Sequence, residues 1–481
     1  MSMLPRLLPR TFYDLVVEVA IVRPGPIQGG MVHPYLLARE RARRELPLKL
    51  EKPELEKALK RTLGVPIFQE QVMQIAIEAA GFSPGRADEL RRSMTAWKRK
   101  GGVHRFRDEL VGGMQAKDYS PEFANAIFQQ MLGFGEYGFP ESHAYSFALL
   151  AYASAWLKRH EPAIFLQALL NAQPMGFYSP SQLVQDARRH GVQVLPVDVC
   201  HSHWLCTLEA PLQTLRGVEQ PQPAVRLGLN RVARLGKAAA LRIEERAAQS
   251  PWADVADLAI RAGLDKADME ALAAADALRS LAGHRRQQMW DAAAQTALPP
   301  IFAQVPIHET PLELPPAREG EEIMFDYAAT GLSLRRHPLA LLRPKLASHG
   351  LKTAAELRQM SPGQKVRACG IVTVRQRPPT AKGTLFITLE DETGVINLVV
   401  WTQTFARWQA PLLVSRLLAV EGVWQTSTAP QLNAEVHEAK HVHTQSEKAP
   451  AAHHLVVMRA RDMTRWLGRF AQVGLSSRDF H

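Results

Sequence analysis

Apolar residues recur at helical spacing through the first two hundred positions of the chain. Leu90, Met94 and Trp97 lie at i, i+4 and i+7, so the face they share is expected to be buried. Ser83 is the expected N-cap of this helix, and Pro84 occupies its first position. Two more faces are expected to pack: Val72, Ile75, Ala76 and Ala79, and Phe147, Leu150, Ala151 and Leu157. The pattern predicts a mostly helical domain over residues 1–204.

The middle of the chain, residues 205–297, is alanine-rich and is also predicted to be helical. A small hairpin at Arg234, Leu235 and Gly236 comes before an amphipathic helix that begins near Lys237. The backbone N–H groups of such a turn, with the positive end of a helix behind them, can bind a DNA phosphate. An ordinary helical packing domain explains the same pattern.

Beyond this region the pattern changes from helices to strands. Residues 298–322 are rich in Pro and Glu and predict an extended linker, and residues 323–364 predict a connecting helical segment. Five runs then have strand character: Lys365 to Gln376, Thr384 to Glu390, Val395 to Trp401, Ser415 to Gln425 and Gln431 to Glu438. With a helix between the third and fourth strands, this is the order of a five-stranded OB-fold barrel. We assign the barrel to residues 365–445 and a C-terminal tail to 446–481, which makes the fold class multidomain α+β.

The predicted barrel carries side chains suited to single-stranded nucleic acid. Arg375, Arg377 and Lys382 can provide positive charge, and Trp401 can stack on a base. Trp401 is equally suited to the barrel core. The inward positions of the second strand alternate in the sequence: Leu385, Ile387 and Leu389.

Composition narrows the class of partner. The 481 residues carry a formal net charge of +11 and a pI near 9.6, which favours a polyanion such as nucleic acid or an acidic membrane surface. Three cysteines argue against a disulfide framework. The uncharged runs are too short or too interrupted for a membrane span of about 20 residues. We therefore expect a soluble, cytoplasmic protein without a membrane partner.

The densest cationic stretch follows the predicted start of the Ser83 helix. Seven Lys or Arg residues and no acid occur from Arg91 to Arg107. Arg91 and Lys98 would share one exposed row of the helix, with Arg92 on the neighbouring row. Paired guanidinium groups can clamp phosphate oxygens, and Lys100, followed by two glycines, could track a nucleic-acid backbone. A solvated basic helix face is the alternative interpretation.

Two other local patterns contain residue types with possible chemistry. Tyr137 and His143 belong to a loop that contains several glycines, and they could stack on or hydrogen-bond to a base, although a lone histidine is more often a structural hydrogen-bonding residue. Four zinc-type residues are crowded into one short segment: Cys200, His201, His203 and Cys206. Zinc usually takes two ligand pairs separated by a longer loop, so we predict no metal site here.

The longer motifs are more specific than any of these residues alone. They read RPGPIQGGMVHPYL, IFQEQVMQIA, ADELRRSMTAWKRK, GFGEYGFPESHAYSFALLAYASAWLKRHEPAIF and VLPVDV, in that order. This series resembles the fingers region of the bacterial C-family DNA polymerases, which include the polymerase III alpha subunit. The amino-acid sequence of these motifs most resembles that of the error-prone, damage-tolerance branch of the family, and so do the final residues SRDFH. The resemblance covers nearly the whole chain, but only the C-terminal part of the family protein.

The resemblance implies roles for several of the candidate residues. The family's helix at Arg91 and Arg92 approaches the incoming triphosphate, and its loop at Tyr137 to His143 lies near the nascent base pair. The central region resembles the family's helix-hairpin-helix pair, although Arg234 stands where the usual Gly-x-Gly hairpin has its first glycine. The family's OB domain meets the template strand.

The resemblance also implies an activity that this sequence cannot complete alone. Template-directed synthesis uses two Mg²⁺ ions held by carboxylates, which the family carries in a Pro-Asp-x-Asp-x-Asp-Phe motif. No such motif occurs in this sequence. We therefore expect binding of primed or single-stranded DNA and of dNTPs without unaided catalysis, in a bacterial, nucleoid-associated protein. Damage-tolerance accessory proteins and the sliding clamp are possible partners. The alternatives are a non-catalytic DNA-binding or scaffold protein, or one half of a split polymerase gene.

Overall fold

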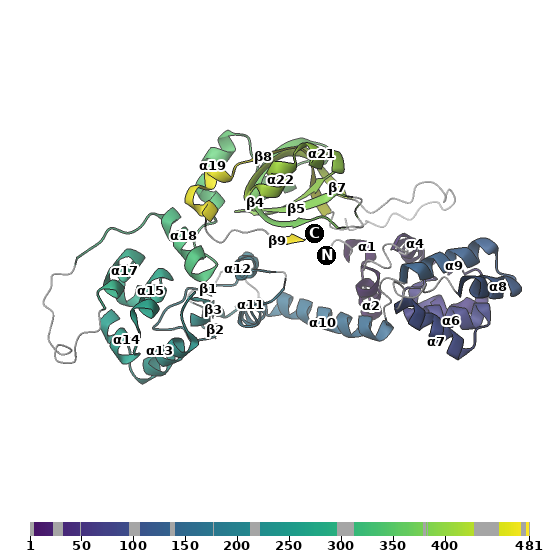
Figure 1. Ribbon diagram of the computed structural model, residues 1–481, viewed down its shortest axis with the longest axis horizontal. Helices are drawn as coiled ribbons and strands as arrows, with labels where there is room; N and C mark the ends of the chain where they lie inside the picture. The colour runs from purple at the N-terminus through teal and green to yellow at the C-terminus, as the bar shows by residue number, and fades with distance from the viewer. Residues whose placement is uncertain are drawn as a thin grey trace. The chain divides into compact units, whose positions relative to one another are not determined.

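The chain folds into two compact units, as seen in a computed structural model (Figure 1). The first comprises Met1–Ala155 and Thr426–Ala452, and the second Trp156–Gln425 and His453–His481. The structure describes residues 4–22, 32–48, 50–95, 106–134, 140–176, 178–211, 222–295, 312–378, 381, 383–427, 452–472 and 478–480. Among these, no helix is long and apolar enough to cross a membrane.

The first unit is helical, as the sequence predicts. Its elements are α1 (Leu4–Leu7), α2 (Phe12–Ile21), α4 (Val32–Arg43), η1 (Pro53–Leu55), α5 (Glu56–Leu59), η2 (Lys60–Thr62), α6 (Gln69–Ala80), α7 (Pro84–Thr95), α8 (Arg107–Ala116), α9 (Pro121–Phe134) and α10 (Glu141–His160). The predicted face of α6 is fully buried, and so is Leu90 on α7. The N–H of Arg86 donates to Ser83 Oγ at 3.3 Å, which confirms the predicted start of α7. Trp97 lies outside the described residues.

The start of α6 is held by one buried glutamine. Gln71 Oε1 accepts hydrogen bonds from the N–H groups of Ile67 and Phe68, at 2.8 and 3.1 Å. Its amide nitrogen donates to the Ala58 carbonyl oxygen and to Thr62 Oγ1. Every polar atom of the Gln71 side chain is therefore used inside the fold, as a buried amide requires.

The expected packing of α10 is wrong. Its only buried residues are Ala144 and Ala148. Phe147, Leu150 and Leu157, which we expected to face a core, are all exposed. The apolar spacing was real, but the small alanines on another side of the helix make the contact with the core, because they allow the closest approach.

The second unit begins with helices that the sequence pattern assigned to the first domain. α11 (Pro162–Asn171) and α12 (Pro180–Arg189) contribute Leu166 and Val184 to the same core as Ile243 and Leu272. The boundary between the two compact units therefore lies inside α10. A small sheet follows, in the order β1 (Val194–Leu195), β3 (Ala224–Arg226), β2 (Thr207–Glu209).

The helices of the second unit continue to residue 358. They are η4 (Leu229–Arg231), α13 (Lys237–Gln249), α14 (Val255–Arg261), α15 (Lys266–Ala274), α16 (Arg279–Ala282), α17 (Arg285–Ala293), α18 (Glu319–Thr330), α19 (Pro338–Ser348) and α20 (Ala354–Arg358). Residues 296–311, most of the predicted linker, lie outside the described residues.

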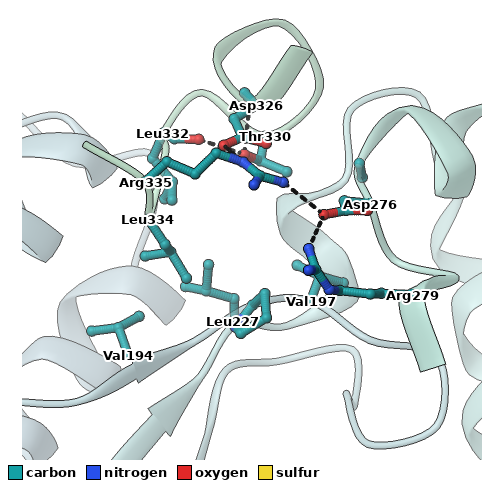
Figure 2. Close-up of a pocket in the computed structure, with 12 residues that line it drawn as sticks. Val194, Val197, Leu227, Asp276, Arg279, Asp326, Thr330, Leu332, Leu334 and Arg335 are labelled. Atoms are coloured by element: carbon teal, nitrogen blue, oxygen red, sulfur yellow. Dashed lines mark hydrogen bonds and ion pairs between the residues drawn. The ribbon is translucent and has the colours of Figure 1, made fainter. Parts of the chain in front are cut away.

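A network of buried charges joins α17 to α18. The side chain of Arg285 is 1% exposed and donates to Glu322 Oε2 at 2.6 Å and to Asp326 Oδ1. Arg335 also pairs with Glu322 and Asp326, and it reaches Asp276 at 3.0 Å. Figure 2 shows Arg335 and Asp276 beside a pocket of about 270 Å³. Arg279 lies 3.1 Å from Asp276, so three arginines face three acids, and this pairing allows the network to stay buried.

The last part of the second unit is a closed five-stranded barrel. Its strands are β4 (Lys365–Gln376), β5 (Leu385–Asp391), β6 (Gly394–Val400), β7 (Leu417–Ser427) and β8 (Ala452–Asp462), with α21 (Thr402–Arg407) and α22 (Gln409–Val414) between β6 and β7. The strand order β5-β6-β8-β7-β4 closes because β4 also pairs with β5. Leu385, Ile387 and Leu389 are all buried, which confirms the predicted alternation. The architecture is the predicted OB-fold.

The strand that closes the barrel is not the predicted one. Residues 431–438, the expected fifth strand, lie outside the described residues. β8 takes the place between β6 and β7, although it belongs to the segment 446–481 that we expected to be a tail. Leu455, Val457 and Ala460 are its buried side chains. A short helix, η7 (Thr464–Gln472), follows, and β9 (Arg478–Phe480) then pairs in parallel with the end of β4.

We expect Gly422→Ala to destabilise the barrel. A Cβ at Gly422 on β7 would lie 2.0 Å from the carbonyl oxygen of Val456 on β8, so the two strands would have to separate. The cost of such overpacking is about 1–3 kcal/mol. Hydrogen exchange should accelerate in β7 and β8, and the unfolding temperature should fall. Gly85→Ala is the control, since a Cβ at Gly85 has no neighbour within 4 Å. Equal stability of both variants would contradict the close approach.

We expect Arg285→Met to destabilise the second unit by about 3–5 kcal/mol, because Glu322 and Asp326 would lose a buried partner. Burial already raises the pKa of Glu322, against the opposing effect of Arg285 and Arg335. Without Arg285 the folded-state pKa should rise further above the unfolded value, so the variant should lose stability as pH rises. Chemical unfolding at pH 5 and pH 8 measures this.

The control for this variant is the neighbouring exposed arginine. Arg286 pairs with Glu321 at 3.0 Å on the surface, so Arg286→Met should cost at most about 1 kcal/mol. A loss that is equal for both arginines, or independent of pH, would show that the buried network has no special role.

Candidate nucleic-acid interface

Trp401 stands at the end of β6, where it is the N-cap residue of α21. Its side chain is 55% exposed, so the alternative of a core tryptophan is excluded. Arg377 follows the end of β4 and is also exposed. Its Nε donates to the Gly383 carbonyl oxygen at 3.3 Å, and its guanidinium carbon lies 4.7 Å from the centre of the Phe405 ring. The cation is thus held in place by a hydrogen bond and a cation–π contact.

The two residues are brought together around Gly383. A Cβ at Gly383 would lie 3.3 Å from Thr402 Oγ1 and 3.5 Å from an Arg377 guanidinium nitrogen. The φ of Gly383 is +81°, a conformation that favours glycine. Because Thr402 directly follows Trp401, the exposed indole and the anchored guanidinium belong to one end of the barrel. Lys382 lies outside the described residues.

Phe386 is a third residue of this surface, and it was not among the residues predicted from the sequence. It points outward from β5 and is exposed, opposite Gln376 on β4 and Val399 on β6. The signal was present in the sequence, since the alternation that buries Leu385 and Ile387 must turn Phe386 to the outside. We name Arg377, Phe386 and Trp401 together the barrel face.

Arg375 does not belong to the barrel face. It is buried, and its Nε donates to the Leu412 carbonyl oxygen at 2.8 Å. A second guanidinium nitrogen donates to the carbonyl oxygen of Ser415, so Arg375 caps the C-terminal end of α22. The reason is a register irregularity in β4 between Val372 and Val374, which turns the following residues to opposite faces.

The first hairpin keeps its turn geometry despite the missing glycine. Arg234 adopts φ +69°, the left-handed conformation that glycine prefers, and its side chain is exposed. Leu235 is buried in the core, so only its backbone is available to a ligand. Gly236 is the N-cap of α13 and supplies no side-chain cap, while Lys237 is exposed. Because glycine has no side chain, Gly236 provides no side-chain acceptor for the first N–H groups of α13.

The second hairpin, between α14 and α15, differs in one respect. Gly263 has φ +58°, as a hairpin turn requires. However, the N-cap residue Asp265 uses its own carboxylate to accept from the N–H of Asp268 at 2.8 Å. The start of α15 is thus already occupied by a negative charge, which would repel a phosphate.

In the first unit, Arg91 and Arg92 are held by one acid that lies one turn before the cationic run. Arg91 donates to Asp88 Oδ1 from Nε at 2.9 Å and from Nη2 at 2.8 Å. Arg92 Nε lies 2.8 Å from Asp88 Oδ2. Hydrogen bonding from Arg91, together with the charge of Arg92, lowers the pKa of Asp88. Lys98 and Lys100 lie outside the described residues.

The start of α10 is fixed by Glu141. Its Oε1 accepts from the Tyr13 hydroxyl and lies 2.8 Å from an Arg61 guanidinium nitrogen, and its N–H donates to Glu70. Burial, and then the hydrogen bond with Glu141, raise the pKa of Tyr13. His143 follows on the first turn, exposed, with its ring 4.6 Å from that of Phe147. Tyr137 lies outside the described residues.

The four zinc-type residues after α12 are directed to separate partners. His201 Nδ1 lies 3.4 Å from Asp198, and His203 Nδ1 lies 2.6 Å from Glu244. Cys206 is buried and accepts from the N–H of Gly228, while burial and then Asp198 raise the pKa of Cys200 to about 11. Across the part of the chain that the structure describes, no three His, Cys, Asp or Glu residues are grouped to hold a metal ion.

Three family models match parts of the chain. The finger domain of the bacterial DNA polymerase III alpha subunit matches residues 1–118, a helix-hairpin-helix motif matches 191–288, and an OB-fold nucleic acid binding domain matches 366–438. Together with the observed folds, these matches show that the chain contains a finger domain like that of the bacterial DNA polymerase III alpha subunit, a helix-hairpin-helix motif and an OB-fold domain.

Over its whole length, the chain is similar to proteins named error-prone DNA polymerase. It is 56% identical to the one from Bordetella bronchiseptica and 51% identical to the one from Methylococcus capsulatus, in each case along its whole length. It is 57% identical to the one from Burkholderia pseudomallei over 88% of its length. The aligned region makes up 43%, 44% and 40% of these three relatives, so the chain spans less than half of their length.

Proposed function

We propose that this chain is the DNA- and nucleotide-binding, C-terminal portion of an error-prone polymerase that extends DNA past damage. The observation that carries the proposal is the barrel face, where an exposed tryptophan and an anchored arginine meet at one end of an OB-fold. An aromatic surface stacks on any base, and a cation beside it contacts the phosphate backbone. This combination suits a template strand of arbitrary or damaged sequence.

The first hairpin is the second proposed DNA contact. Arg234 and Lys237 add positive charge on either side of Gly236, and the start of α13 offers its N–H groups to a phosphate. Leu235 contributes through its backbone, since its side chain is buried. We propose that the second hairpin contributes packing instead, because Asp265 caps its helix.

The arginine pair on α7 is the proposed contact with the incoming triphosphate. Asp88 holds both guanidinium groups side by side, and a triphosphate would compete with it for their hydrogen bonds. Lys98 and Lys100 would extend this contact along the nucleic acid. Tyr137 and His143 would lie near the base, as the family resemblance implies.

Mg²⁺ belongs to the proposal only for the complete polymerase. Two-metal phosphoryl transfer needs clustered carboxylates, and the described residues do not fit such a pair of ions. We assign this chain the binding of DNA and dNTPs and no catalytic step. Its cytoplasmic, nucleoid-associated location, and contacts with damage-tolerance proteins or a sliding clamp, stay predictions from the family resemblance.

We expect Trp401→Ala to weaken binding of single-stranded DNA by about 1–3 kcal/mol, the value of one stacked base. Arg377→Ala should weaken binding of all sequences alike and reduce the salt dependence by about one unit of slope. Fluorescence anisotropy with a labelled oligonucleotide at several salt concentrations measures both. Trp290→Ala on α17 is the control, since Trp290 is 52% exposed and outside the barrel face. An unchanged affinity for Trp401→Ala would refute the barrel face.

We expect Arg91→Ala/Arg92→Ala to weaken dNTP binding far more than binding of single-stranded DNA. The reason is that the paired guanidinium groups are placed for a compact triphosphate and not for an extended backbone. Calorimetric titration with a dNTP, beside the anisotropy assay, makes the comparison. Arg41→Ala/Arg44→Ala removes the same charge at the C-terminal end of α4, which runs to Arg43, and should change neither. Equal losses of both ligands in the α7 variant would point to a general electrostatic effect.

A further inference from the structure

α10 has an apolar surface that the described contacts leave open. Between Ser142 and Ala155 it carries no Asp, Glu, Lys or Arg. Its large apolar side chains there are about half exposed or more: Tyr145, Phe147, Leu149, Leu150 and Tyr152. A helix that is apolar on several sides normally lies in the interior of a larger protein. A patch of this kind on a soluble surface indicates an interaction site.

The exposed side chains follow two rows of the helix. Tyr145, Leu149 and Tyr152 lie at i, i+4 and i+7, and the ring of Phe12 on α2 contacts Tyr145 at a centroid distance of 4.9 Å. Phe147 and Leu150 form a separate row, three residues apart. Leu149 and Leu150, at 56% and 62% exposure, are the least covered. The buried Ala144 and Ala148 face the core, so both rows can be covered by a partner without moving α10.

The chemistry of this surface favours a polypeptide over nucleic acid. Binding to a phosphate backbone depends on cations, and the stretch from Ser142 to Ala155 has none. Tyr145, Phe147 and Tyr152 could stack on bases, but the same stretch has no cation to contact the phosphates, and Leu149 and Leu150, the least covered residues, offer a base no stacking surface. They instead match an apolar protein surface, whose burial supplies the free energy of association.

We propose that this surface of α10 is the docking site for the part of the polymerase that lies outside the aligned region. The proposal rests on the proposed function, namely that the chain works as a portion of a longer polymerase. The occupant is inferred from length, because the aligned region is only 43% of the Bordetella bronchiseptica relative. More than half of that protein is thus available to cover α10, either within one chain or as a separate one.

The test uses the full 481-residue chain and, as a probe, the unaligned portion of the Bordetella bronchiseptica polymerase, shown to be folded by circular dichroism. We expect a one-to-one complex in sedimentation velocity, with hydrogen exchange slowed in α10. Leu149→Gln/Leu150→Gln should weaken it at least tenfold. Ile260→Gln/Val414→Gln removes two apolar residues elsewhere that are even more exposed, at 72% and 73%, and should leave the complex unchanged. No complex, or equal binding by both variants, would overturn the proposal.

A second measurement does not depend on the separate probe. In a chimera, this chain replaces the aligned segment of the Bordetella bronchiseptica polymerase. Leu149→Gln/Leu150→Gln should lower the unfolding temperature of the chimera by several degrees but leave the isolated chain unchanged, because only the chimera buries α10. Equal effects in both proteins would refute the docking site.

Two results would assign α10 to another occupant and so reject the proposal. Concentration-dependent dimers of the isolated chain, lost in Leu149→Gln/Leu150→Gln, would identify a second copy. A loss of single-stranded DNA affinity as large as that of Trp401→Ala would identify nucleic acid. The DNA titration also separates this inference from the proposed function, since a failed complex with intact Trp401-dependent DNA binding would reject the docking site alone.

Discussion

Closure of the barrel by β8 is the constraint on which the barrel face depends. β8 fits between β6 and β7 only because Gly422 lets the two backbones approach to a distance that no side chain allows. With the barrel closed, the ends of β4 and β6 are fixed, and these ends carry Arg377 and Trp401. The positions of Trp401 and Arg377 therefore depend on the close backbone packing of β7 against β8 in the same sheet.

The helical part uses charge in two different ways. Between α17 and α18, arginines and acids are buried together, and their pairing fixes how the helices join. On α7, Asp88 orders two arginines that stay at the surface. The buried arginines are enclosed with their acids, so no ligand can replace those acids. The two arginines on α7 lie at the surface, as the proposed contact with a triphosphate requires.

The sequence predicted the elements with strong periodicity, including the buried face of α6, the start of α7 and the alternation in β5. The predictions were wrong where the sequence pattern does not show which residues a given face of a helix or strand contacts. α10 has regular apolar spacing, yet only its alanines are covered. Arg375 was placed on the wrong face because a bulge in β4 cannot be read from alternation. β8 could not be predicted from the order of the strands, because the earlier run 431–438 has the same strand character. The exposure of Phe386 follows from the alternation in β5.

The short β9 has a practical consequence for anyone who expresses this chain. Its residues Arg478–Phe480 pair with Val374, Arg375 and Gln376, directly before the Arg377 that anchors the barrel face. An affinity tag fused after His481 would therefore sit beside the surface whose ligand affinity is to be measured. A protease site that trims the last few residues would uncover an edge of β4 and invite pairing between molecules. A tag before Met1 avoids both artefacts.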